Sequence, residues 1–345
     1  MFDKKTVFII GAGAGVEIDM PVGGQLSHTI ANKTYIRHKD YSAELITGDY
    51  AVSNALMRIT RARGLDYNAW RAEACAIREG IFETRSIDAY LNTHKDNEAV
   101  KIAGKLAIVQ SILEAEKDCD LYRESRGDWK NGSKVASSWL PELFYIMQDS
   151  VGKADDIQKI FSNLAFITFN YDRCLEHYLY YTIMGLYRLN EQEAAEIMAS
   201  LEIYRPYGQV GSLNWERKGK TKIAFGGKAH EAIEALAEEI KTFNEQIEDQ
   251  IILQKIRGTI NTAARIVFLG FHYHKQNMDL MTVTDTSDSG RPSVIANAFD
   301  RSGPEVGMIQ ERIAKMLGEK RPAKSIEMYG HGCKSLFKNF AATWM

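Results

Sequence analysis

Cysteine is scarce in this sequence, and its positions do not suit metal ligands or disulfide partners. The chain has 345 residues but four cysteines, with no Cys-x-x-Cys pair among them: Cys75, Cys119, Cys174 and Cys333. This wide spacing indicates neither a zinc ribbon nor a disulfide framework. We therefore expect reduced cysteines with mostly structural roles.

Long apolar runs and an excess of one charge sign are absent too. No stretch is long and apolar enough to span a bilayer. The short apolar run after Lys5 is followed by Glu17 and Asp19 without a convincing small-residue cleavage site, which argues against a signal peptide. The formal net charge of -2 gives no support for a broad nucleic-acid or membrane surface. We expect a cytoplasmic protein.

The most informative stretch is the apolar run over residues 7–10, which ends in three closely spaced glycines, Gly11, Gly13 and Gly15. This pattern is typical of a buried strand that breaks into a tight turn whose bare backbone can approach a ligand phosphate. A nucleotide is therefore the first candidate ligand. A plain turn that binds nothing is the alternative, because glycines serve ordinary turns as well.

Two common nucleotide motifs are missing at this turn. Val16 stands where the dinucleotide fingerprint has its third glycine, and no clear second strand with a terminal acidic residue follows, which disfavours an ordinary dehydrogenase. No Gly-Lys-Ser/Thr follows the glycines, which argues against a P-loop ATPase.

The composition, with 45% hydrophobic and 26% charged residues, is that of an ordinary globular protein. The length corresponds to about two domains or to one large domain with an insertion. We expect a single domain over residues 1–345 with a mostly helical insertion at residues 53–151. Three- and four-residue steps within this insertion indicate one buried helix face: Ile102, Leu106, Val109 and Leu113.

Short apolar segments separated by helical stretches predict the sheet. The expected strands cover residues 7–10, 164–169, 265–269, 293–297 and 324–328. They predict an α/β fold with a doubly wound, mostly parallel, Rossmann-like sheet covered by helices on both faces. Ligands of such sheets bind at the carboxyl ends of the strands, where Gly11, Asn170 and Gly270 lie.

A long amphipathic helix is expected over residues 228–258. Its apolar stripe steps by three or four residues: Ile233, Leu236, Ile240, Phe243, Ile247 and Ile251. The stripe is either an assembly surface or a face that packs on the protein's own core.

Four motifs carry a resemblance to a known family. They are Gly-Ala-Gly-Ala-Gly-Val-Glu-Ile-Asp-Met-Pro at 11–21, Thr-Phe-Asn-Tyr-Asp at 168–172, Tyr-Gly-Gln-Val-Gly-Ser at 207–212 and Phe-Leu-Gly-Phe at 268–271. In this order they resemble a sirtuin-like domain, and more closely the bacterial sirtuin-like proteins of anti-phage defence, whose better-known members hydrolyse NAD. The lack of paired cysteines separates the chain from lysine deacylases, which usually carry a zinc module.

The resemblance implies NAD as substrate or ligand and no resident metal. It assigns cofactor binding to residues of the first, second and fourth motifs: Gly11, Ala12, Gly13, Gly15, Pro21, Asn170, Gly270 and Phe271. It implies that the Asn170 amide positions the nicotinamide ribose or a water, and that Asp172 orients polar groups of the same pocket. An N-cap of the next helix is the alternative role for these two residues.

The family's catalytic histidine is missing from the third motif. Tyr207 and Arg205 occupy the two positions at which relatives carry it, and neither side chain accepts a proton readily near neutral pH. His28, His272 and His274 are candidates to replace the missing base, because a histidine titrates near neutral pH. The alternative is that each is an ordinary surface or hydrogen-bonded histidine. His272 and His274 have no third ligand at a recognisable spacing, so no metal site is expected.

The expected function is hydrolysis of the nicotinamide N-glycosidic bond of NAD in anti-phage defence, controlled by a protein partner or by homo-oligomer assembly. A catalytically impaired, nucleotide-binding regulatory subunit of a defence complex is the alternative, and the two substitutions at Arg205 and Tyr207 favour it. A redox dehydrogenase is a third possibility, which Val16 disfavours.

Overall fold

A six-stranded parallel sheet forms the centre of the computed structural model, which describes the chain except residues 1, 3, 41, 43, 125–126, 150, 152–153, 218, 285–289, 320 and 341–345. The strands are β1 (Thr6–Ile10), β4 (Leu164–Thr168), β5 (Ile203–Tyr204), β6 (Arg265–Leu269), β7 (Ser293–Asn297) and β8 (Ser325–Tyr329). Their order is β5-β4-β1-β6-β7-β8, with every neighbouring pair parallel. Counted along the chain this is 3-2-1-4-5-6, the order typical of doubly wound dinucleotide-binding sheets. The prediction of an α/β fold is confirmed.

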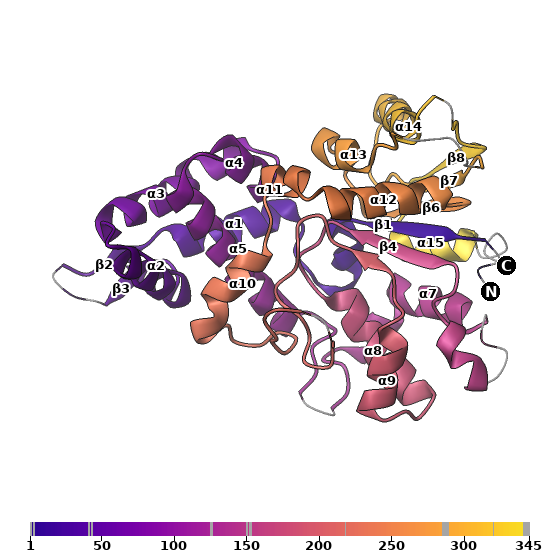
Figure 1. Ribbon diagram of the computed structural model, residues 1–345, viewed down its shortest axis with the longest axis horizontal. Coiled ribbons are helices and arrows are strands. Elements are labelled where there is room, and N and C mark those ends of the chain that lie inside the picture. Colours follow the sequence, from indigo (N-terminus) through magenta and orange to yellow (C-terminus); the bar gives the residue numbers. More distant parts are fainter. Residues whose placement is uncertain are drawn as a thin grey trace.

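Helices cover both faces of the sheet (Figure 1), which explains why its inner strands are continuous apolar runs. Side chains alternate between the faces, so Val7 and Ile9 belong to one core cluster while Phe8 and Ile10 belong to the other. The first cluster includes side chains of α12 (Gln250–Thr262), α13 (Lys275–Met281) and α14 (Gly303–Leu317). The second includes side chains of α7 (Trp139–Gln148), α8 (Cys174–Leu186), α9 (Glu191–Met198) and α15 (Cys333–Asn339).

A helical lobe extends from the sheet at the left of Figure 1. It consists of α1 (Gly23–Thr34), α2 (Tyr50–Arg63), α3 (Tyr67–Gly80), α4 (Ile87–Thr93), α5 (Glu98–Asp118), α10 (Ile233–Glu239) and the hairpin of β2 (Arg37–His38) and β3 (Leu45–Thr47). Short 3-10 turns, η1 (Ala12–Ile18), η2 (Ile81–Glu83), η3 (Ala154–Lys159) and η4 (His230–Ala232), link several elements. None of the described helices is long and apolar enough to cross a membrane.

The expected insertion at residues 53–151 is mostly helical, but it does not form one unit. Its first part belongs to the helical lobe, whereas α6 (Gly132–Ala136) and α7 pack on the sheet side. Trp139 of α7 stacks on Phe337 with ring centroids 6.0 Å apart, and its indole N–H donates to the Ala14 carbonyl at 2.8 Å. These contacts give the second part a place in the sheet core.

The prediction of one long helix over residues 228–258 is wrong. The segment contains η4, α10, α11 (Phe243–Glu248) and the first part of α12, with breaks at 240–242 and at 249. At the first break the Lys241 N–H donates to the Tyr207 carbonyl at 3.0 Å, and Thr242 then caps α11 in a capping box with Glu245. The apolar stripe does not share one face, because Ile240 is buried while Ile251 is 70% exposed.

Candidate functional site

A cavity of about 410 Å³ lies where the carboxyl ends of β1, β4 and β6 meet the helical lobe. The sheet side supplies the residues after these strands, and the lobe supplies the start of α1, the start of α4 and Ile112 of α5. The strand order changes direction between β1 and β6, so the cavity lies at the position where doubly wound sheets bind their ligands.

Five residues expected to bind a cofactor line this cavity: Gly11, Ala12, Pro21, Asn170 and Phe271. Four residues expected to be catalytic line it as well: Asn170, Asp172, Tyr207 and His272. The other expected residues, Gly13, Gly15, Gly270, Arg205 and His28, do not belong to its described lining.

Gly13 and Gly270 are required by packing between two strand ends. A Cβ atom at Gly13 would lie 2.8 Å from the Gly270 carbonyl oxygen, and one at Gly270 would lie 1.9 Å from the Ala14 nitrogen. Gly270 also has a φ of +56°, a backbone conformation that residues other than glycine rarely adopt. Gly15 similarly approaches Met20, because a Cβ atom at Gly15 would lie 2.8 Å from the Met20 Cβ. The glycines were expected to make room for a phosphate, and the structure shows that they also make room for the protein's own backbone and for Met20.

The backbone N–H groups of the turn are partly used within the protein. The Gly13 N–H donates to the Gly270 carbonyl at 3.0 Å, and the Ala14 N–H donates to the Gly11 carbonyl at 3.0 Å. The start of α1 also lines the cavity, and its backbone is not covered by other atoms. A Cβ atom at Gly23 or Gly24 would meet no atom within 4 Å. The first turn of α1 has no acidic residue, so its positive dipole end is not neutralised by one.

Asn170 lies two residues after the end of β4, in the cavity wall. Its side-chain N–H donates to the Gly11 carbonyl at 3.4 Å, while its amide oxygen is buried without a hydrogen-bond partner among the described residues. A buried amide oxygen without a partner is uncommon in a folded protein and indicates a place for a ligand or a water. Asn170 does not cap α8, since that helix begins four residues later at Cys174.

Arg205 fixes the loop that carries Asn170 and is not directed at the cavity. Its guanidinium donates to the carbonyls of Asn170 and Asp172, both at 2.9 Å, and pairs with Glu176. Burial works against its charge, but the carboxylates of Glu176, Asp172 and Glu216 together outweigh burial and raise the pKa of Arg205. The residue is therefore a permanent cation with a structural role, which excludes it as the missing base.

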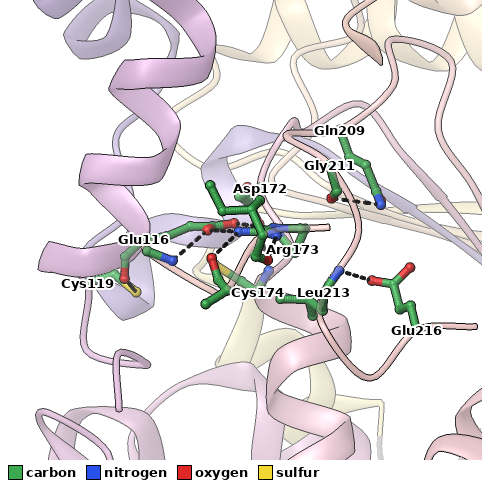
Figure 2. A network of polar contacts seen from close by, with 12 residues as sticks. Glu116, Cys119, Asp172, Arg173, Cys174, Gln209, Gly211, Leu213 and Glu216 are labelled. Atoms are coloured by element: carbon green, nitrogen blue, oxygen red, sulfur yellow. Dashed lines mark hydrogen bonds and ion pairs between the residues drawn. The ribbon is translucent and has the colours of Figure 1, made fainter. Parts of the chain in front are cut away.

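A second buried ion pair holds the same loop from the lobe side. Figure 2 shows Arg173 bonded to Glu116 of α5, and both side chains are fully buried. Arg173 also donates to the Ile223 carbonyl at 2.7 Å, and Glu116 accepts from the Gly226 N–H at 3.0 Å. Since Arg173 follows Asp172 directly, this network sets the position of the Asn170–Asp172 loop relative to α5.

Two pairs of polar side chains line the cavity, and in each pair a tyrosine hydroxyl is the donor. The Tyr171 hydroxyl donates to the Asp88 carboxylate of α4, and the Tyr207 hydroxyl donates to Asn277 at 2.7 Å. Burial raises the pKa of Tyr171 and of Tyr207 well above the usual value, and the nearby Asp88 charge adds to both shifts. The two phenols therefore stay protonated and act as hydrogen-bond donors.

The histidines differ in their distance from the site. His28 is exposed on α1, and its ring packs on the Phe82 ring with the two ring centroids 4.6 Å apart. His272 and His274 line the cavity with their rings 5.8 Å apart. Burial and the neighbouring His272 lower the pKa of His274 to about 4, and burial and Arg301 lower the pKa of His272. Both lining imidazoles are thus neutral at pH 7.

Sequence reasoning missed several lining residues, namely Arg85, Ser86, Asp88, Lys275 and Asn277. The first three surround the start of α4, where Ser86 accepts from the Ala89 N–H as an N-cap. A Ser followed by an apolar segment is a usable helix-start signal. Nothing in the local sequence indicates that this helix start faces the sheet. Together with the α1 N-terminus, Arg85 and Lys275 make the cavity suitable for an anionic ligand.

No group of three or more His, Cys, Asp or Glu side chains in the described part of the chain is arranged to hold a metal ion. Comparison of the sequence with known protein families gives no match, and comparison with curated proteins gives no match either.

Proposed function

We propose that the protein binds NAD in this cavity and hydrolyses the bond between nicotinamide and ribose. The observation that carries the proposal is the placement of Asn170: its partnerless amide oxygen lies in a cavity at the switch point of a 3-2-1-4-5-6 sheet. The motif resemblance supplies the chemistry, since the sirtuin-like proteins of anti-phage defence act on NAD. An anti-phage role and control by a partner or by assembly rest on that resemblance alone.

The proposed reaction breaks one bond and forms one. The nicotinamide nitrogen leaves with the electron pair of the N-glycosidic bond, positive charge develops on the ribose, and a water oxygen bonds to the same carbon while losing a proton. Asn170 would orient the ribose or the water, and the α1 N-terminus with Arg85 would hold the pyrophosphate. The helical lobe would keep bulk water from the reacting atoms.

A nucleotide-binding subunit without catalysis is the second candidate function. It is favoured by the state of the lining groups, because Tyr207 stays protonated and the pKa of His274 is about 4. Such a subunit would bind ADP-ribose or NAD and release no nicotinamide.

Asn170→Ala tests the proposal. We expect the wild-type protein to bind ADP-ribose in calorimetry and to release nicotinamide from NAD, and the variant to lose at least about 100-fold in nicotinamide release because the reacting groups lose their alignment. The fold should be kept, since Asn170 makes one long side-chain hydrogen bond. Asn54→Ala, at an exposed position on α2, is the matched control. Undiminished release by a folded Asn170→Ala protein would falsify the assigned role.

A further inference from the structure

Hydrolysis is assisted by a cavity group that takes the proton of the attacking water. The described lining residues that titrate are Arg85, Asp88, Tyr171, Asp172, Tyr207, His272, His274 and Lys275. Arginine and lysine are donors, and the two tyrosines keep their protons. His272 and His274 follow β6, which β1 separates from β4 and its Asn170 loop. The two carboxylates belong to that loop or contact it, since Asp172 follows Asn170 by two residues and Asp88 accepts from Tyr171.

Asp172 is engaged at the start of α8. Its carboxylate accepts the Cys174 N–H at 3.1 Å, and its carbonyl accepts from Arg205. Together with Asn170 and Arg205, it also lines a second, small cavity. This placement suits a residue that shapes the loop.

Asp88 is placed differently. It comes from α4 of the helical lobe, lines the cavity, and accepts a hydrogen bond from Tyr171, the residue directly after Asn170. A carboxylate accepts hydrogen bonds in about four directions, so capacity remains after the Tyr171 hydroxyl and its own backbone N–H. Burial raises the pKa of Asp88, which makes its carboxylate a stronger base than an exposed one.

We propose that Asp88 is the proton acceptor of this cavity and that Tyr171 positions it. The inference rests on the proposed NAD hydrolysis. As the water oxygen bonds to the ribose carbon and the nicotinamide leaves with the bonding electron pair, one water proton passes to a carboxylate oxygen of Asp88. The proton then leaves to solvent, so that NAD and water give nicotinamide, ADP-ribose and one proton.

The surroundings of Asp88 fix the direction of its pH response. Tyr171 and Tyr207 face it from the sheet side, and Arg85 precedes α4. Glu245 of the adjacent α11 is neutralised by Lys105 at 2.7 and 2.8 Å. Tyr171 donates to the charged form of Asp88, so it lowers the pKa of Asp88 against the effect of burial. Activity should therefore rise with pH as Asp88 loses its proton.

Asp88→Asn is the first variant. We expect ADP-ribose affinity within about threefold of wild type, nicotinamide release reduced at least about 100-fold, and loss of the acid limb of the rate profile. Asp88→Glu should restore part of the rate. Asp96→Asn, an exposed acidic residue of the same lobe, should leave rate and profile unchanged.

Tyr171→Phe tests the positioning role. The phenylalanine keeps the ring and removes the hydrogen bond that favours the charged carboxylate, so the acid limb should move to higher pH by about one unit. Tyr90→Phe is the matched control, because Tyr90 is also a buried tyrosine, lies on α4, and donates to the Ala76 carbonyl away from the cavity.

The results separate the two proposals. Wild-type protein that releases no nicotinamide at any pH overturns the proposed function and this inference with it. Active wild type, together with an Asp88→Asn protein of unchanged rate and profile, overturns the inference alone. Loss of the acid limb in Asp172→Asn rather than in Asp88→Asn also overturns the inference. So does a pH–rate profile of Tyr171→Phe that is identical to that of wild type.

Discussion

Tyr207 and Arg205 occupy the two positions at which a catalytic histidine was expected, yet only Tyr207 faces the candidate cavity. Tyr207 lines the cavity and is 3% exposed, whereas Arg205 is enclosed by two backbone carbonyls and Glu176. A base introduced at position 207 would therefore reach a ligand, and a base at position 205 would not.

Tyr207→His should raise nicotinamide release by about tenfold or more, because the introduced imidazole would lie near Asp88 and accept a proton at neutral pH. The variant should lose about 1–2 kcal/mol of unfolding free energy, since a large buried ring and its bond to Asn277 are removed. Nicotinamide quantification and chemical denaturation measure the two effects.

Tyr207→Phe controls for the loss of the hydroxyl group without adding a base. A protein that binds ADP-ribose but stays silent after Tyr207→His would support the regulatory subunit and contradict the enzyme.

At the scale of elements, the sequence predicts where strands lie better than it predicts where a helix is interrupted. The cores of β1, β4, β6 and β7 are apolar runs bounded by polar or glycine positions, and they lie where expected. β5 has two residues, too few for a periodic signal. The break near Ile240 was missed because an apolar stripe continued through it, although the Thr242 to Glu245 spacing is a recognisable capping box.

The N-terminus of α1 is the part of the site that can be changed without disturbing packing. We expect Gly24→Asp to weaken ADP-ribose binding about tenfold, because a carboxylate there opposes an anionic ligand at the positive end of the helix. The substitution has room, since a Cβ at Gly24 meets no atom within 4 Å. Calorimetry gives the affinity, and thermal unfolding should show unchanged or slightly raised stability.

Gly24→Asn has nearly the same size without the charge and should bind almost as wild type does. Equal weakening by both variants would contradict the electrostatic explanation. Gly13→Val is unsuitable for this purpose, because its side chain would collide with Gly270 and disturb the strand ends.

Only some residues of the candidate site can be predicted from the sequence. Asn170 and Phe271 follow apolar strands, so the topology of a parallel sheet predicts that they converge. Asp88 lies more than 80 positions before Tyr171 on a short helix, and only tertiary packing brings the two together. The reason for Gly13 was also hidden, since a close ligand and a close backbone impose the same requirement.

At the scale of the whole molecule, buried carboxylates make stability depend on pH. Glu216 accepts the Leu213 N–H at 2.9 Å (Figure 2), and burial with the nearby Glu176 raises its pKa from 4.5 to about 7. Between pH 4.5 and about pH 7, Glu216 therefore keeps a proton in the folded state that it has released in the unfolded state. The stability from this group is complete below pH 4.5 and is lost as pH rises through about 7.

Glu216→Gln should remove this loss. Relative to wild type, the variant should gain about 2 kcal/mol of unfolding free energy between pH 5 and pH 8, measured by urea denaturation at both values. Glu231→Gln, at an exposed position, is the control and should show no such difference. A Glu216→Gln protein whose stability runs parallel to wild type over this range would show that Glu216 titrates normally.

The central position of β1 has a consequence for synthesis. Thr6 of β1 lies opposite Leu164 of β4 on one side and Arg265 of β6 on the other, so β1 is synthesised well before both strands that pair with it. At about 5–20 residues per second, translation from β1 to β6 takes roughly 13–50 s. Helices α1 to α5 contact one another and can begin to pack during this interval, whereas the contacts of α2 and α5 with α10 form later. The lining residues after β6 are thus added to the cavity after those of β1, α1 and α4, and a nascent chain released before β6 would lack Phe271, His272 and His274.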